Sequence, residues 1–166
     1  TTTTALLGEI MKNYKESVFV VGNIGTPYTG VVPETTPDSV VVAEISSFQL
    51  ETVHEFRPKV SAILNITPDH LNRHHTMENY AEVKESITKN QTKEDTCVLN
   101  YSDPYTRAIG ERCPAHVVWF SSKEQPAEGL YLEGEEIFRI GDGEKERVMN
   151  IHEMQIMGVN NGENVM

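Results

Sequence analysis

The sequence predicts an α/β fold in which a three-layer, open and mostly parallel sheet is followed by an appended antiparallel β segment. Short runs of branched apolar residues alternate with helical segments, a pattern typical of parallel strands buried on both faces. After residue 129 the pattern changes to alternating residues separated by Glu-Gly and Asp-Gly turns, which is typical of antiparallel strands. The 166 residues are enough for one ordinary domain.

The elements follow in order along the chain. Parallel strands are expected at 17–22, 39–45, 60–66, 96–100 and 116–121. Helices are expected at 1–14, 46–56, 76–90 and 103–112. Ser46 and Gln49 have the spacing of a capping box, so we interpret Ser46 as the start of the second helix rather than as a catalytic residue.

The two ends of the sequence predict an internal segment of a longer protein. The chain begins inside a helical pattern, and its last residues, GVNNGENVM, have the pattern of the first turn of another helix. We therefore expect further domains of the same chain on both sides of residues 1–166.

Composition narrows the classes of partner. The net charge of -11, from 25 acidic and 14 basic residues, argues against a nucleic acid or an anionic membrane as partner. The apolar runs are shorter than the ~18 residues of a membrane span. Cys97 and Cys113 lack the spacing of metal ligands, so they fit core positions in a reduced, cytoplasmic protein.

Polar residues follow three of the predicted parallel strands. Asn23 follows the first strand, Glu44 ends the second, and Asp69 and His70 follow the third. Each alone has an ordinary explanation, as a turn asparagine, an exposed acid or a loop histidine. Ligands of open α/β sheets bind at the carboxyl ends of the strands, so the three together favour a ligand site. Carboxylate and imidazole suit Mg²⁺ that carries phosphates, and Thr1 could be the hydroxyl residue that ends a phosphate loop.

Several segments occur in an order and spacing that resemble the central ATPase domain of the Mur ligases. They are TTTTALLGEI, VVGNIGTP, VVAEISSFQLE, NITPDHLNRH, MENYAEVKESI and IMGVNNGEN. The resemblance implies a P-loop NTPase-like fold and an ATP-dependent ligase that works in the bacterial cytoplasm. It is strongest to members that add D-glutamate to UDP-N-acetylmuramoyl-L-alanine through an acyl phosphate, which makes a peptidoglycan precursor.

The resemblance also implies roles for individual residues. Thr1 and Glu44 would hold one Mg²⁺ on the β- and γ-phosphates of ATP, and His70 would hold a second Mg²⁺ near the carboxylate that is activated. Lys84 corresponds to a carbamylated lysine that also binds the second Mg²⁺. Glu44, His70 and Lys84 would therefore be the catalytic residues, and Asn23 would contact the muramoyl-alanine substrate.

Two asparagines, Asn161 and Asn164, correspond to a pair that lies near the adenine of ATP. The sequence departs from many relatives at Asn160, where histidine is common, and at Asn72, where aspartate is common. In the predicted helix 76–90 the apolar stripe passes close to Lys84. Spacing alone equally allows a lysine whose methylenes line the core while its ammonium reaches solvent.

Alternative functions remain at this stage. They are a folylpolyglutamate synthase-type or other Mur amide ligase, and a nucleotide-binding module that does not catalyse a reaction. The resemblance places the phosphate loop, an N-terminal substrate domain and a C-terminal domain outside residues 1–166. We therefore expect the isolated segment to be inactive.

Overall fold

The computed structural model describes residues 1–154 and 161–166. Contacts within the chain divide it into two compact units. The first contains residues 1–49 together with Val165, and the second contains residues 50–164 together with Met166.

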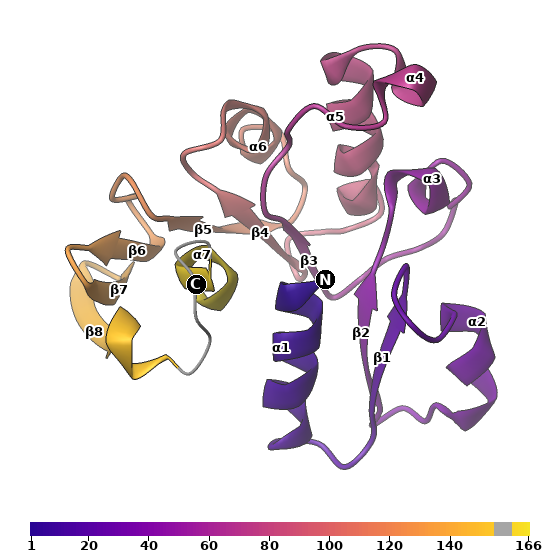
Figure 1. The fold of residues 1–166 in the computed structure, drawn as a ribbon, viewed down its shortest axis with the longest axis horizontal. Coiled ribbons are helices and arrows are strands. Elements are labelled where there is room, and N and C mark those ends of the chain that lie inside the picture. Colours follow the sequence, from indigo (N-terminus) through magenta and orange to yellow (C-terminus); the bar gives the residue numbers. More distant parts are fainter. Residues whose placement is uncertain (155–160) are drawn as a thin grey trace. The chain divides into compact units, whose positions relative to one another are not determined.

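The first unit is built on a pair of parallel strands, β1 (Val18–Gly22) and β2 (Val40–Glu44) (Figure 1). Its helical elements are α1 (Thr2–Lys12), α2 (Tyr28–Val31) and the 3₁₀ turn η1 (Val32–Glu34). The register places Gly22 opposite Glu44. Gly22 has a φ of +105°, and a Cβ there would lie 2.1 Å from the carbonyl oxygen of Glu44. A glycine is therefore required where these two strands end.

The second unit contains a six-stranded sheet in the order β3-β4-β5-β6-β7-β8 (Figure 1). Its strands are β3 (Val60–Ile63), β4 (Thr96–Asn100), β5 (His116–Ser121), β6 (Gly129–Glu133), β7 (Glu136–Gly141) and β8 (Glu144–Asn150). The first four run parallel, whereas β7 pairs antiparallel with both β6 and β8. This arrangement confirms the predicted fold class, including the antiparallel segment at the end.

The remaining helical elements are short. They are α3 (Ser47–Leu50), α4 (Leu71–His74), α5 (Met77–Glu85), η2 (Ser86–Thr88), α6 (Pro104–Gly110), η3 (Ile151–Glu153) and α7 (Asn161–Val165). The helix expected at the end of the sequence is thus confirmed as α7. None of the described helices is long and apolar enough to cross a membrane.

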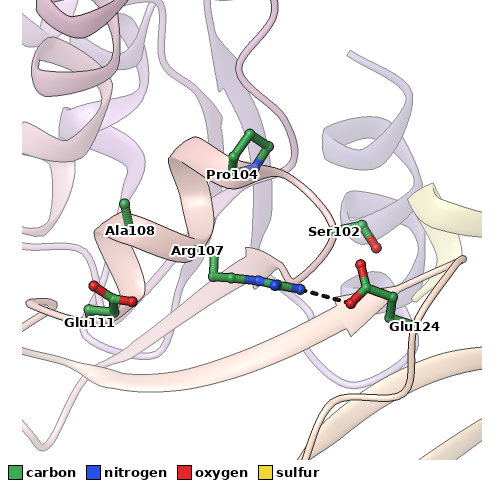
Figure 2. A pocket seen from close by; sticks show the side chains of 6 residues that line it. All are labelled: Ser102, Pro104, Arg107, Ala108, Glu111 and Glu124. Carbon is green, nitrogen blue, oxygen red and sulfur yellow. Dashed lines mark hydrogen bonds and ion pairs between the residues drawn. The ribbon is translucent and has the colours of Figure 1, made fainter.

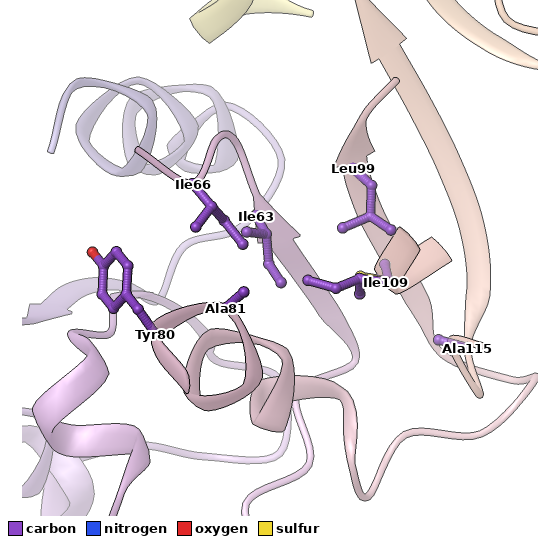
Figure 3. Packing of buried hydrophobic residues seen from close by; sticks show 8 residues of the cluster. Ile63, Ile66, Tyr80, Ala81, Leu99, Ile109 and Ala115 are labelled. Carbon is purple, nitrogen blue, oxygen red and sulfur yellow. The ribbon is translucent and has the colours of Figure 1, made fainter. Parts of the chain in front are cut away.

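The core of the second unit lies where α5 and α6 pack against β3 and β4 (Figure 3). Its buried residues are Ile63, Ile66, Tyr80, Ala81, Cys97, Leu99, Ile109 and Ala115. Cys97 is fully buried and Cys113 packs against the cluster from a half-buried position, and neither forms a disulfide. The core position expected for each cysteine is therefore confirmed for Cys97, whereas Cys113 lies at the edge of the core.

A buried carboxylate joins the amino ends of β3 and β4. Asp95, which immediately precedes β4, is 1% exposed. Its Oδ2 accepts hydrogen bonds from Arg57 Nε at 2.7 Å and from the Thr92 backbone nitrogen at 2.9 Å. Its Oδ1 accepts a hydrogen bond from Lys59 Nζ at 3.0 Å. The protein itself therefore supplies donors to both oxygens of this acid.

Two features of the fold differ from the sequence-based expectation. Among the described residues, no strand hydrogen bonds connect β1 and β2 to the six-stranded sheet, so the parallel strands form two ladders. The helix predicted at 46–56 extends only over Ser47–Leu50. Beyond it, the carbonyls of His54 and Phe56 accept hydrogen bonds from Asn90 Nδ2 at 2.8 and 3.0 Å, so a distant side chain holds this segment.

The start of this short helix is nevertheless as predicted. The Ser46 backbone nitrogen donates to Gln49 Oε1 at 2.8 Å, and the Gln49 backbone nitrogen donates to Ser46 Oγ at 3.3 Å. This reciprocal pair is a capping box and confirms the structural role assigned to Ser46.

Candidate functional site

Three of the predicted site residues lie together at the carboxyl end of β2. The backbone nitrogen of Asn23 donates to the Glu44 carbonyl at 2.7 Å, and Asn23 Nδ2 donates to Glu44 Oε1 at 3.2 Å. The amino nitrogen of Thr1 lies 2.8 Å from Glu44 Oε2. The parallel pairing of β1 and β2 produces this cluster, because it brings the residue after Gly22 beside the end of β2.

The electrostatic environment of Glu44 suits a cation. Burial raises its pKa, but hydrogen bonds from Thr1 and from the amide of Asn23 lower it, so that the pKa lies below its usual value. Glu44 is therefore ionised at neutral pH. Its Oε2 is shielded from solvent and lies 2.8 Å from the Thr1 nitrogen. Carboxylate and hydroxyl oxygens are the ligands Mg²⁺ prefers, so Glu44 and Thr1 fit the cation implied by the sequence.

The segment after β3 pairs a carboxylate with an imidazole. His70 has a left-handed backbone with a φ of 52° immediately before α4. Asp69 Oδ1 accepts a hydrogen bond from the His70 backbone nitrogen at 2.8 Å, and Asp69 Oδ2 lies 3.4 Å from His70 Nε2. The imidazole is 46% exposed. Asp69 thus orients both the backbone and the ring of His70, leaving the ring accessible to a ligand.

Lys84 lies on the helix α5, as predicted. Thr76 caps this helix by accepting a hydrogen bond from the Asn79 backbone nitrogen at 3.2 Å. Tyr80 and Ala81 are buried, which confirms part of the expected apolar stripe. Lys84 is half-buried, and its Nζ lies 4.9 Å from the centroid of the Tyr80 ring. The amine of Lys84 therefore lies over the ring of a buried tyrosine of the same helix.

The predicted metal-binding residues belong to different units. The structure brings Thr1 and Glu44 together in the first unit, and His70 and Lys84 belong to the second. Within residues 1–154 and 161–166, no group of at least three His, Cys, Asp or Glu side chains is arranged to hold a metal ion. Mg²⁺ bound with nucleotide phosphates and water needs only one or two carboxylates, so this arrangement is compatible with the expected chemistry.

A cavity of about 240 Å³ lies in the second unit at the carboxyl end of β3. It is lined by Leu64, Asn65, Glu163 and Asn164. The structure therefore places Asn164 in a cavity, whereas the side chain of Asn161 and the whole of Asn160 lie outside the described part of the chain. Sequence reasoning missed Asn65 and Glu163. Asn65 follows a parallel strand, so the strand-end rule that selected Glu44 could also have found it.

A second cavity, of about 230 Å³, lies beside α6 (Figure 2). Its lining residues are Ser102, Pro104, Arg107, Ala108, Glu111 and Glu124. Arg107 donates from Nη2 to Glu124 Oε2 at 3.0 Å and from Nε to the Tyr101 carbonyl at 2.8 Å. Its guanidinium also stacks 4.0 Å from the centroid of the Tyr101 ring. The charges of Arg107 and Glu124 are thus paired with each other, and no predicted site residue lines this cavity.

The whole sequence matches a known protein family. The model of the Mur ligase middle domain matches residues 1–166. The UDP-N-acetylmuramoylalanine--D-glutamate ligases of Lachnoclostridium phytofermentans and Lachnospira eligens are 63% and 60% identical over 100% and 99% of the chain. The corresponding enzyme of Clostridioides difficile is 49% identical over 100% of the chain. The chain spans 37% of the length of each of these relatives.

Solved structures show the same fold at much lower identity. A UDP-N-acetylmuramoyl-L-alanyl-D-glutamate--2,6-diaminopimelate ligase superposes on 99% of the chain with a TM-score of 0.74 and 17% identity, and the match covers 39% of that protein. The MurF ligase of Thermotoga maritima in complex with ADP superposes on 89% of the chain with a TM-score of 0.61 and 22% identity, covering 37% of that protein. The family model matches the whole chain, and a member of the family is 63% identical to it over its full length. The chain therefore belongs to the Mur ligase family, as a middle domain of that family.

Proposed function

We propose that the chain is the ATP-binding middle domain of a ligase that adds D-glutamate to UDP-N-acetylmuramoyl-L-alanine. The observation that carries this proposal is the 63% and 60% identity, over essentially the whole chain, to relatives named for that reaction. The reaction consumes ATP, proceeds through an acyl phosphate and makes a peptidoglycan precursor in the cytoplasm. The sequence resemblance described above supports the same reaction.

The full-length protein would contain further domains. Because residues 1–166 span 37% of the relatives' length, we assign the phosphate loop, the N-terminal substrate domain and the C-terminal domain to the rest of the chain. Those flanking domains are the partners of this one.

The strand-end residues of the first unit would hold the metal and the substrate. Glu44 and Thr1 would hold a Mg²⁺ for the nucleotide phosphates, because Glu44 is an ionised carboxylate, partly shielded from solvent, that lies beside Thr1. Bound Mg²⁺ neutralises charge on the phosphate oxygens. Asn23 would contact the muramoyl-alanine substrate while its amide fixes the Glu44 carboxylate. Phosphoryl transfer depends mainly on such positioning, so no covalent nucleophile is needed.

In the second unit, His70 and Lys84 would bind the second Mg²⁺. Asp69 orients His70 from one side, which leaves the half-exposed ring to face the substrate carboxylate. Lys84 would act as a carbamate: its neutral amine adds to CO₂, forming a nitrogen–carbon bond and releasing a proton. The product is an anionic oxygen ligand on a helix whose neighbouring turn is fixed by the buried Tyr80.

The carbamate can be tested separately from the reaction itself. In the full-length chain, Lys84→Ala should abolish turnover, and formate or acetate in excess should restore part of it by filling the ligand position. A matched change, Lys89→Ala, removes a nearby exposed lysine and should leave turnover unchanged. Undiminished activity of Lys84→Ala, or loss without any rescue, would contradict the carbamate.

Nucleotide binding is assigned to α7. Asn164 lines the cavity at the end of β3, and Asn161 lies on the same helix. We place the adenine of ATP at this helix because the cavity combines an apolar side chain, Leu64, with amide groups. Such a combination is typical of ligand pockets.

The direct test is an assay of the full-length chain with ATP, Mg²⁺ and UDP-N-acetylmuramoyl-L-alanine. Release of phosphate and formation of the amide are followed with D-glutamate, L-glutamate, L-lysine or diaminopimelate as the amine. We expect turnover with D-glutamate alone. Turnover with another amino acid would identify a different amide ligase of the family, folate-dependent turnover would identify a folylpolyglutamate-type ligase, and no turnover with bound ATP would identify a non-catalytic module.

A further inference from the structure

We propose that Glu163, held in place by Ser122, selects the base of the bound nucleotide by accepting a hydrogen bond from its exocyclic amino group. The inference rests on the proposed function, because it places the base of ATP in the cavity that Asn164 lines. It goes beyond that function in two ways. It assigns the selection of the base to the carboxylate of Glu163, and it assigns the positioning of that carboxylate to Ser122, which follows β5.

The first support is the hydrogen bond that fixes Glu163. Ser122 Oγ donates to Glu163 Oε1, although the two residues are 41 positions apart in the sequence. Ser122 immediately follows β5, and both residues are half-buried. A carboxylate has two oxygens with about four acceptor positions, and the serine hydroxyl uses one of them. The carboxylate is therefore held on the cavity wall with acceptor capacity remaining.

The second support is the chemistry of the cavity. Leu64 offers an apolar surface, Asn65 and Asn164 can each donate and accept, and Glu163 when ionised can only accept. At about 240 Å³ the cavity is smaller than the ~300–1,000 Å³ of a pocket that encloses a whole drug-sized ligand. It suits one heteroaromatic ring rather than a complete nucleotide.

An acceptor-only group discriminates between purines. A carboxylate accepts a hydrogen bond from the 6-amino group of adenine, whereas the 6-oxo group of hypoxanthine or guanine would bring two acceptors together. Glu163 would therefore favour an aminopurine and reject an oxopurine. Ser122 acts as a positioning residue, because it keeps the carboxylate at the depth where that edge of the base lies.

The experiment compares ATP with inosine triphosphate, which carries an oxo group in place of the amino group. kcat/KM is measured for both nucleotides in the full-length chain and in its Glu163→Gln, Ser122→Ala and Ser122→Thr variants. Glutamine can donate to the oxo group, so Glu163→Gln should reduce the preference for ATP by about tenfold. Ser122→Ala should reduce it by a smaller factor, and Ser122→Thr, which keeps the hydroxyl, should retain it.

A matched control is Glu124→Gln, which makes the same chemical change in the cavity beside α6 and should leave the ratio unchanged. If the wild-type chain shows no ATP-dependent ligation, the proposed function itself fails. If it ligates with ATP but Glu163→Gln keeps the wild-type ratio within about twofold, base selection by Glu163 is overturned. Should Glu163→Gln not fold, an unchanged ratio in Ser122→Ala would overturn the proposal and a reduced ratio would support it.

Discussion

Two carboxylates next to parallel strands, Glu44 and Asp95, differ in how their oxygens are satisfied. Asp95, at the amino end of β4, receives donors on both oxygens from Arg57, Lys59 and Thr92. Glu44, at the carboxyl end of β2, receives the Asn23 amide on one oxygen, and its other oxygen, shielded from solvent, faces the Thr1 nitrogen at 2.8 Å. An acid held by side-chain cations of the same fold serves the fold, whereas an acid at a strand end that those cations do not neutralise can serve a ligand.

The direction of the pKa shift does not separate the two acids. The hydrogen bond from Arg57 is the main reason that the pKa of Asp95 lies far below its ordinary value. The pKa of Glu44 is also lowered, although burial opposes the effect of Thr1 and Asn23. What distinguishes them is the partner: Asp95 is held by the side-chain cations of Arg57 and Lys59, whereas Glu44 faces the Asn23 amide and the Thr1 nitrogen.

The largest expected effect is on catalysis, through Glu44→Gln in the full-length chain. The change keeps the shape of the side chain but removes the charge that would hold the cation. Turnover should therefore fall by about 100-fold, while the melting temperature changes little. Steady-state kinetics and thermal denaturation measure the two quantities. Glu9→Gln, an equivalent change at an exposed position of α1, is the control, and wild-type turnover in Glu44→Gln would show that Glu44 binds no essential cation.

The opposite pattern is expected for Asp95→Asn. Removing this charge leaves Arg57 and Lys59 without their anionic partner at the amino ends of β3 and β4. The melting temperature should fall by about 5–10 °C, whereas the KM for ATP should change little. Thermal denaturation followed by circular dichroism tests this expectation. An unchanged melting temperature would mean that the Asp95 network does not stabilise the fold.

At low pH, the difference in melting temperature between the wild type and Asp95→Asn should disappear. Because the pKa of Asp95 is lowered by folding, its contribution to stability is complete above its ordinary value of 3.8 and declines as the pH falls below that value. The gap in melting temperature should therefore be constant between about pH 7 and 5 and should shrink below about pH 4. Melting curves across this range measure the gap, and a gap that widens in acid would contradict the assignment.

The smallest expected effect is that of Lys59→Met. The Lys59 side chain is 76% exposed, and Arg57 and Thr92 would still donate to Asp95 after the change. The melting temperature should fall by at most about 2 °C, because an exposed ion pair contributes little. Thermal denaturation measures the change, and a loss as large as that of Asp95→Asn would show that Lys59, not Arg57, is the essential partner.

Much of the fold was predictable because it depends on neighbouring residues. The strands β4 and β5 have the predicted bounds, since a run of branched apolar residues needs no distant partner to be recognised. The capping box of Ser46 and Gln49 formed as expected for the same reason. The predicted helix 46–56 was too long, and the segment after it is held by Asn90, which binds the carbonyls of His54 and Phe56 from a position that sequence periodicity does not reveal.

The candidate site, like the fold, has features that the sequence predicts and features that depend on the tertiary structure. The sequence by itself determined that Asn23 and Glu44 are polar residues at strand ends, because the strand pattern fixes where each apolar run stops. Only the tertiary structure decided that Asp95 pairs with the cations of Arg57 and Lys59, whereas Glu44 faces the Asn23 amide and the Thr1 nitrogen. Arg57 reaches Asp95 across 38 residues and Ser122 reaches Glu163 across 41, and such hydrogen bonds depend on how strands and helices pack rather than on local spacing.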